Sequence, residues 1–278
     1  MTTATRDKVG DRDASFVEGS EPAGPAVDPQ VKEARRAERL RLLVQPVVAL
    51  LLAAAVLVWA LVIRTLTDTE KATVNVDSVW SLTLQHLAIT FVVAAIVLAV
   101  AVPLGILLTR PGFTWLSPFF VGIANIGAAA PAIGLLVLYY LAINMTGFWT
   151  GVLPIAFYSL LPVLRNTILG FQEVDRTLVD AGRGQGMSAS TVLRRIEFPL
   201  AVPYILAGLR TSLVLAVGTA TLCFLVGAGG LGELINTGYK LNLSVALVLG
   251  AVLAVALALL VDWLGALAEQ FLGPKGLR

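Results

Sequence analysis

Six long apolar blocks constrain this chain more than any other feature of its sequence. They cover roughly residues 43–63, 83–109, 117–142, 149–169, 202–226 and 243–267. A helix rises about 1.5 Å per residue, so about 20 residues are needed to cross the ~30 Å hydrocarbon core of a bilayer. The sequence therefore predicts an all-α integral membrane protein with about six transmembrane helices.

The composition agrees with a membrane location and excludes several classes of protein. Hydrophobic residues make up 57% of the chain and charged residues only 14%, which is too few to cover the surface of a soluble domain of 278 residues. A net charge of +2 gives no electrostatic basis for binding nucleic acid. With one cysteine, Cys223, an intramolecular disulfide and a cysteine metal cluster are excluded, and the only histidine is His86. We expect His86 to be a packed or interfacial residue.

The basic residues predict the orientation in the membrane. Most of the 20 Lys and Arg residues lie in the N-terminal tail, at Arg110, between Arg165 and Arg195, or at the C-terminus. By the positive-inside rule, both termini are then cytoplasmic, in a multi-pass protein of the plasma membrane. Arg210 falls inside the fifth block, and we expect its side chain to snorkel toward the inner face.

Changes in composition divide the chain into three parts. Residues 1–42 have the composition of a disordered cytoplasmic tail with a basic juxtamembrane segment. Residues 43–77 form an additional N-terminal transmembrane helix and its outer loop. Residues 78–270 form the main transmembrane domain, which contains an unusually long polar loop at about residues 171–200.

The first half of this loop has the pattern of a short helix. Val174, Leu178 and Ala181 recur at helical spacing, which predicts an apolar face. The glycines between Gly182 and Gly186 weaken the helix, because each costs about 1 kcal/mol relative to alanine. We therefore expect a turn after this helix.

The second half of the loop has the pattern of another short helix. Ser188 or Ser190 can cap its beginning, and Val192 and Ile196 provide an apolar edge. Pro199 is expected to end this helix before the next span. On these features alone, the hairpin either has a function of its own or merely joins two spans at the membrane interface.

The spacing within the loop resembles a known motif. Asp180-Ala181-Gly182 is followed after three residues by Gly186, and after nine more by Ile196-Glu197-Phe198-Pro199. This run resembles the EAA loop of binding-protein-dependent ABC importer permeases, which reads Glu-Ala-Ala, three residues, Gly, nine residues, Ile-x-Leu-Pro. Asp180, Gly182 and Phe198 depart from that pattern, and Gly182 puts the first helix in doubt.

The resemblance implies a contact with a separate cytoplasmic ATPase. In such permeases, the short helix after the glycine is a coupling helix that docks in a groove of the ATPase. Gly186, Met187 and Ser188 would then form the turn and the start of this helix, with Arg194 and Arg195 near the contact. The sequence contains no G-x-x-x-x-G-K-[ST] phosphate loop, so ATP and Mg are expected on the partner ATPase, with no cofactor in this chain.

Further matches are similar to one branch of these permeases, which transports glycine betaine, choline, carnitine and related osmoprotectants. They are Trp80–Leu87, Val102–Arg110, Ile205–Thr211, Gly218–Thr221 and Gly227–Gly232, and they fall within about residues 78–240. The resemblance implies an extracytoplasmic substrate-binding protein and a second permease chain, in a homodimer or a heterodimer. It does not extend to residues 1–77.

A solute path is harder to place in the sequence. Pro131, between Gly127 and Gly134, predicts a broken or kinked helix, which is tolerated where backbone lines a cavity. Asn125, Thr219 and Thr221 are polar residues within the spans that can face such a path. The alternative is packing through small residues, with the hydroxyl groups bonded to their own helix backbone.

Three other functions compete with this interpretation. A permease for an amino acid or another betaine-like solute would have a closely similar sequence. A stand-alone secondary transporter needs intramembrane carboxylates for ion coupling, whereas the blocks contain essentially none and Asp262 lies near the end of the last. A membrane-embedded enzyme is disfavoured by the shortage of catalytic side chains.

Overall fold

The computed structural model describes residues 29–63 and 65–272, and every regular element in these ranges is a helix. The contacts divide the chain into two units, residues 1–39 and residues 40–278, and the features below belong to the second. The disorder predicted for residues 1–28 lies outside the described residues. Helix α1 begins at Pro29, within the segment predicted as the N-terminal tail. Residues 31–42 are rich in Ala, Arg, Glu and Leu, which favour helix.

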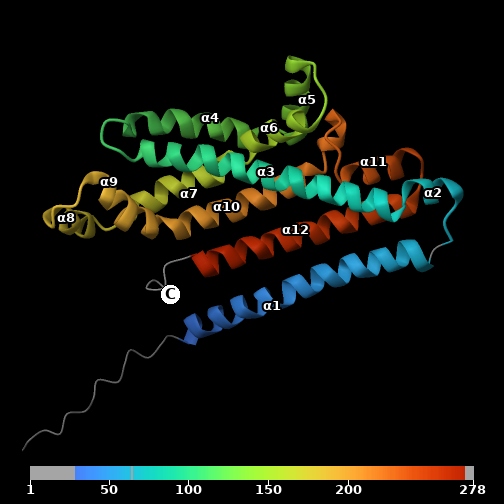
Figure 1. Ribbon diagram of the computed structural model, residues 1–278, viewed down its shortest axis with the longest axis horizontal. Coiled ribbons are helices and arrows are strands. Elements are labelled where there is room, and N and C mark those ends of the chain that lie inside the picture. Colours follow the sequence, from blue (N-terminus) through green and yellow to red (C-terminus); the bar gives the residue numbers. More distant parts are fainter. Residues whose placement is uncertain (1–28, 64, 273–278) are drawn as a thin grey trace, which may run out of the picture. The chain divides into compact units, whose positions relative to one another are not determined.

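The order of elements is simple, and Figure 1 shows the longest helices of the larger unit running side by side. The elements are α1 (Pro29–Val58), a π turn η1 (Trp59–Ile63), α2 (Asp68–Thr73), α3 (Val76–Leu108), η2 (Thr114–Leu116), α4 (Ser117–Ala129), α5 (Ala132–Ile143), α6 (Phe148–Tyr158), α7 (Leu160–Gln172), α8 (Arg176–Gly184), α9 (Ala189–Val192), a π turn η3 (Leu193–Glu197), α10 (Phe198–Ala220), η4 (Cys223–Val226), α11 (Gly232–Lys240) and α12 (Ser244–Leu272).

The predicted all-α membrane class is confirmed, but the six blocks are not six straight helices. Among the described residues, three helices are long and apolar enough to cross a membrane, at Val76–Leu108, Ala189–Ala220 and Ser244–Leu272. The number rises to five if each of two bent pairs is counted as one span, with bends of 102° between α4 and α5 and 42° between α6 and α7. The first predicted block corresponds to a shorter apolar helix, Leu42–Val58.

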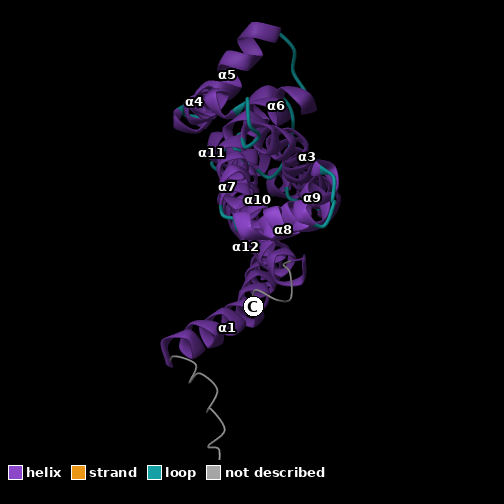
Figure 2. Cartoon of the chain, turned by 90° about the vertical axis from the view of Figure 1, so that its left-hand side faces the viewer, coloured by secondary structure: helices purple, strands orange, loops and turns teal. Residues whose placement is uncertain are grey.

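The break expected at Pro131 is confirmed. Helix α4 ends at Ala129, and Ala130 has an extended backbone with φ −70° and ψ 143°. The ring of a following proline disfavours the helical conformation of the residue before it, so Ala130 is the position at which the helix must open. Helix α5 therefore leaves the direction of α4, as Figure 2 shows, and Leu136 is its only buried residue.

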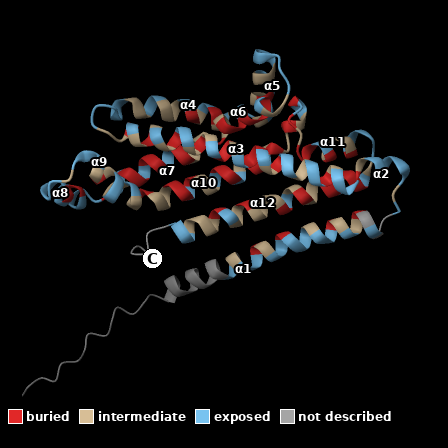
Figure 3. Ribbon diagram, in the orientation of Figure 1, coloured by how far each residue is buried: buried red, intermediate tan, exposed pale blue. Residues whose placement is uncertain are grey.

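Helix α10 forms the centre of the packing, in contact with α3, α7 and α12. Figure 3 shows buried residues along the faces by which these helices meet. A Cβ atom at Gly208 would lie 2.8 Å from the carbonyl oxygen of Pro162 in α7, so only glycine allows this approach. Membrane helices pack closely where small residues let the two backbones meet.

His86 is a packed residue, as the sequence predicted, and it connects three segments. Its side chain is fully buried in α3, and its Nε2 lies 3.0 Å from the carbonyl oxygen of Val217 in α10. Its Nδ1 accepts a hydrogen bond from the backbone N–H of Leu231 at 3.4 Å. One neutral tautomer, with the proton on Nε2, satisfies both contacts.

Arg210 is paired with two acidic side chains of α12. Its Nε lies 2.6 Å from Oδ1 of Asp262, and its Nη1 lies 3.2 Å from Oε2 of Glu269. Gly265 leaves room for the stem of the arginine, since a Cβ there would lie 2.9 Å from Arg210 Cγ. The ion pair offsets the cost of placing these charges within a largely apolar bundle, because each charge neutralises the other.

The additional helix α1 is joined to the same charged cluster. Gln45 Nε2 donates to Oδ2 of Asp262 at 2.7 Å and to the carbonyl oxygen of Leu259 at 3.0 Å. Trp263 Nε1 donates to the carbonyl oxygen of Leu42 at 2.8 Å. These polar contacts give α1 a defined place against α12, since apolar side chains alone would pack as well against lipid.

We expect Arg210→Met to lower the free energy of unfolding by about 2–3 kcal/mol, because it leaves the partly buried Asp262 without its cation. Adding Asp262→Leu should recover part of this loss, because the carboxylate that Arg210 neutralised is then removed as well. Thermal unfolding of the detergent-solubilised chain measures both effects, with Arg176→Met on the exposed surface of α8 as the control. A double variant less stable than Arg210→Met would show that the pairing is not the cause.

Candidate functional site: the α8–α9 loop

The loop predicted at about residues 171–200 extends from the end of α7 to the beginning of α10 and contains α8 and α9. Figure 2 looks onto this end of the structure, where α8 and α9 lie in front of α7 and α10. A small apolar core of Val174, Val179 and Val192 holds the loop together. The loop is thus a folded hairpin of helices and not an extended connection.

Helix α8 presents a different face from the one predicted. Val179 and Gly182 are buried, whereas Leu178 and Ala181 are exposed. The prediction failed because it counted the helical period from Val174, which lies before the helix. Asp175 is the cap, and its Oδ1 accepts the backbone N–H of Thr177 at 2.8 Å, a bond that holds the pKa of the Asp175 carboxyl below its usual value.

Gly182 is compatible with the first helix, because α8 continues to Gly184. A Cβ atom at position 182 would lie 2.6 Å from Cδ1 of Ile196. Glycine therefore lets Ile196 pack directly onto the backbone of α8. This contact joins two residues that lie 14 positions apart in the motif, and it accounts for one of the three departures from the family pattern.

The turn between the two helices is formed at Gly186. Its φ of +80° lies in the left-handed region, which a residue with a Cβ rarely adopts. The backbone N–H of Met187 then donates to the carbonyl oxygen of Gly182 at 3.1 Å, which closes the turn. Ser188, one of the two predicted caps, accepts the backbone N–H of Thr191 at 3.3 Å and begins α9.

Pro199 does not end the second helix, contrary to prediction. The helical segment continues from Ala189 to Ala220 through the π turn at Leu193–Glu197. In that turn, the backbone N–H of Phe198 donates to the carbonyl oxygen of Leu193, five residues back. The wider turn accommodates a residue that has no N–H to donate and whose ring would crowd the preceding α-helical turn.

An ion pair not foreseen from the sequence fastens this π turn to the bundle. Arg110 Nη2, after the end of α3, lies 2.6 Å from Oε2 of Glu197. The guanidinium carbon of Arg110 also lies 5.5 Å from the ring centroid of Phe171, whose ring is 6.4 Å from that of Phe198. In the sequence, the only sign of this ion pair was a single arginine, Arg110, at the end of an apolar block and a single glutamate, Glu197, between Ile196 and Phe198.

Apart from Glu197, the charged residues of the loop remain on its surface. Asp180, Arg183, Arg194 and Arg195 are all exposed. Together with the exposed Gly186 and Ser188, they form a polar outer face over a buried apolar side. Such a face is suited to contact with another protein through charge and shape.

The four candidates for a solute path are not brought together. Asn125 Oδ1 accepts Nη2 of Arg165 at 3.0 Å, and Pro131 is exposed at the bend between α4 and α5. Thr219 Oγ1 donates to the carbonyl oxygen of Leu215 at 2.7 Å, and Thr221 Oγ1 donates to that of Gly218 at 2.7 Å. The two threonine hydroxyls bond to their own helix backbone, as the alternative explanation proposed.

Comparison with known proteins identifies the family that carries this loop. The family model of binding-protein-dependent transport system inner membrane components matches residues 101–273, well over half of the chain. The chain belongs to this family. It is therefore a multi-pass importer permease, the membrane subunit of a transport system that depends on a binding protein.

Curated relatives of this permease are similar over most of their length. The choline transport system permease protein OpuBB of Bacillus subtilis is 36% identical over 70% of this chain and 89% of its own. The osmoprotectant import permease protein OsmW of Salmonella typhimurium is 36% identical over 73% and 96%. The carnitine transport permease protein OpuCD of Listeria monocytogenes is 40% identical over 63% and 78%.

A solved structure shares the fold of the permease. A chain of the MetNI methionine ABC transporter, in an inward-facing conformation, superposes with a TM-score of 0.62 at 22% identity. The match covers 75% of this permease and 100% of that chain. The fold found here is thus the fold of a known ABC transporter chain.

We expect Glu197→Gln to loosen the loop, because the charge-assisted bond to Arg110 contributes about 2 kcal/mol. Cleavage by trypsin after Arg183 should accelerate about tenfold in membranes that contain the variant permease. The control Glu173→Gln removes an exposed carboxylate next to the loop and should leave the cleavage rate unchanged. Equal rates for both variants would exclude the proposed role of the ion pair.

Proposed function

We propose that the α8–α9 loop is the surface on which a cytoplasmic ATPase drives this permease. The observation that carries the proposal is the continuity of α9, the π turn and α10 in a single helical segment, Ala189–Ala220. A push on α9 is then a push on a membrane-spanning helix, with no flexible joint between the two. ATP and Mg are bound by the ATPase, and the permease chain itself is not catalytic.

The contact residues follow from which parts of the loop are exposed. Gly186 and Ser188 form the tip, and Arg194 and Arg195 lie on the exposed side of the second helix. Asp180 and Ala181 are exposed on α8, whereas Gly182, Met187 and Ile196 hold the inner side together. We assign the exposed residues to the ATPase contact. The inner residues Gly182, Met187 and Ile196 are assigned to the stiffness of the loop. Closure of the ATPase pair then shifts the spans between inward-open and outward-open states.

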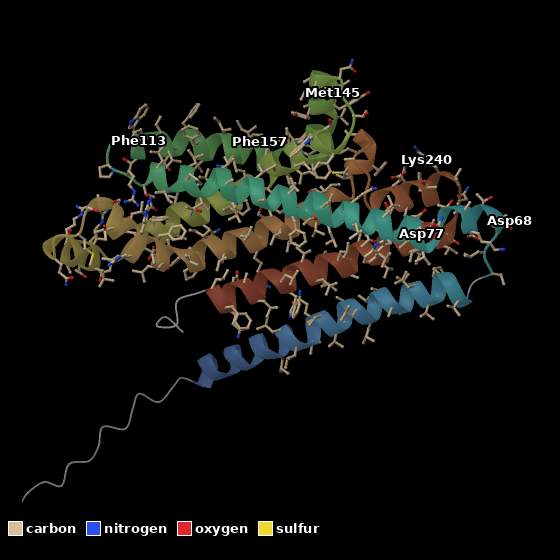
Figure 4. All side chains as sticks on the ribbon, viewed as in Figure 1. Asp68, Asp77, Phe113, Met145, Phe157 and Lys240 are labelled. Carbon is tan, nitrogen blue, oxygen red and sulfur yellow. The ribbon has the colours of Figure 1, made fainter. Side chains whose placement is uncertain are left out.

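The charges of the two ends support an orientation with both termini in the cytoplasm. The α8–α9 end carries Arg110 and the loop arginines, whereas Figure 4 shows Asp68, Asp77 and Lys240 near the opposite end. Leu42 of α1 lies beside Trp263 in the second half of α12. The segment around Leu42 and the C-terminal half of α12 therefore lie at the same end of the bundle. The basic end faces the cytoplasm, where positively charged segments are retained.

The solute proposed for this permease is a quaternary amine osmoprotectant such as glycine betaine, choline or carnitine. This substrate class is supported by relatives that are 36–40% identical to this chain and are named as permeases for choline, glycine betaine or carnitine. A separate extracytoplasmic protein delivers the solute, and a second permease chain completes the pathway, either identical to this one or related to it. Residues 78–270 form the transport domain, and the helix within residues 43–77 is an addition to it.

Two alternatives are less well supported. The proposal of an amino-acid substrate is based on the similarity to the methionine transporter. At 22% identity, that similarity supports a shared fold and not a shared substrate. A secondary transporter needs an intramembrane carboxylate that an ion can reach and neutralise. Asp262 is already paired with Arg210 at 2.6 Å, so its charge is balanced within the protein.

We expect cells that produce this permease with its ATPase and binding protein to accumulate labelled choline, glycine betaine or carnitine against a gradient. Methionine supplied at the same concentration should not accumulate. Depletion of cellular ATP should stop uptake, whereas collapse of the ion gradients alone should not. Accumulation of methionine only would overturn the substrate class, and uptake independent of ATP would overturn the coupling.

We expect Gly186→Val to reduce uptake at least about fivefold, because a β-branched residue at φ +80° strains the turn by about 1–3 kcal/mol. Gly184→Val is the matched control: a Cβ meets nothing within 4 Å at either position, and only Gly186 has a positive φ. Immunoblots of the membrane fraction should show equal amounts of both variants. Equal uptake by both variants would contradict a coupling role for the turn.

A further inference from the structure

A polar cavity lies at the end of the bundle remote from the α8–α9 loop. Its volume is about 610 Å³, a size typical of small-molecule sites. Its lining comes from α3, α6, η4 and α11, and from the glycine-rich stretch between η4 and α11. The side chains that matter chemically are Gln85, Phe148, Phe224, Glu233, Asn236 and Thr237.

One carboxylate dominates the charge of this cavity. Glu233, in the first turn of α11, is exposed and makes no ion pair with any residue in the described ranges. An acidic residue there also stabilises the beginning of its helix. Stabilising the helix does not require a cavity. Here, however, the carboxylate lines the same cavity as two aromatic side chains, Phe148 and Phe224.

The wall of the cavity is held by backbone contacts that depend on glycine. Gly229 and Gly230 have φ values of +82° and +91°, and a Cβ at Gly229 would overlap the side-chain amide of Gln85. The backbone N–H of Gly230 donates to Oε1 of Gln85 at 3.3 Å, beside the contact of His86 with Leu231. The stretch is therefore fixed against α3, and the cavity exists before any solute arrives.

The opposite wall is fixed in a similar way. The backbone N–H of Gly147 donates to the carbonyl oxygen of Val226 at 2.8 Å, which joins the beginning of α6 to η4. This bond places Phe148 and Phe224 on the same cavity. The ring of Phe148 also packs edge-on against Trp149, with centroids 5.5 Å apart. Two aromatic rings and a carboxylate are thus presented from elements joined by hydrogen bonds.

We propose that this cavity is a binding site within the permease for the quaternary ammonium group of the solute. A quaternary cation has no N–H to donate, so it is recognised by negative charge and by aromatic surface, which Glu233, Phe148 and Phe224 supply. The side-chain amides of Gln85 and Asn236 and the hydroxyl of Thr237 offer donors to the hydroxyl or carboxylate at the other end of the solute. This inference rests on the proposed function and adds a site and a charge preference to it.

The test compares two solutes that share a trimethylammonium group and differ in net charge. The complete transporter, reconstituted in liposomes with saturating loaded binding protein, is assayed for its maximal rates of choline and glycine betaine uptake. Glu233→Gln should lower the choline rate at least about fivefold and the glycine betaine rate by less, because betaine carries its own carboxylate. ATPase stimulation by the loaded binding protein should stay unchanged, and Glu233→Asp should restore part of the choline rate.

Asp77→Asn is the control, since it removes one exposed carboxylate at the same end of the bundle and outside the cavity lining. An unchanged ratio of choline to betaine rates in Glu233→Gln would overturn the site. A parallel loss of both rates and of ATPase stimulation would overturn it as well and would assign Glu233 to the docking of the binding protein. A wild-type transporter that moves neither solute would instead overturn the proposed substrate class, a result distinct from failure of the variant alone.

Discussion

The π turn between α9 and α10 is the feature on which the proposed coupling of this permease depends. A proline seven residues after the end of α9 would normally separate a surface helix from the membrane span that follows. The turn at Leu193–Glu197 removes that separation, because Phe198 bonds to a carbonyl five residues back. The polar loop and the central helix of the bundle are consequently one rigid segment. Arg110 and Phe171 then fasten this segment to α3 and α7 at the point where it enters the bundle.

Two arginines of the described bundle, Arg110 and Arg210, are matched by carboxylates from distant parts of the chain. Arg110 meets Glu197, and Arg210 meets Asp262 and Glu269. An unpaired charge in hydrocarbon costs several kcal/mol, so these pairs specify which helices are neighbours and at what height. The same cluster gives the additional helix α1 its attachment through Gln45. A helix outside the family match is thus integrated by polar contacts.

The two ends of the permease use glycine for different purposes. At the loop, Gly186 reverses the chain and Gly182 lets Ile196 approach the backbone, which makes a compact and stiff contact surface. At the other end, Gly229 and Gly230 shape the wall of a polar cavity against Gln85. Helix α10 joins these ends: its first turns adjoin the loop, and Val217 near its end bonds to His86 next to that wall. In the proposed mechanism, a displacement of α10 by the loop would therefore reach the wall of the cavity.

The sequence by itself determined the helical membrane class, the position of the loop and the break at Pro131. These are local properties, set by the length of an apolar run, by motif spacing and by the steric effect of proline on the preceding residue. Only the tertiary structure decided that Pro199 does not end the helix, that Arg210 stays in the bundle, and which loop residues are buried. The partners involved lie 52 residues apart for Arg210 and Asp262 and 87 apart for Arg110 and Glu197. Periodicity shows that a helix has a face but not which face it meets, and that depends on how the whole bundle packs.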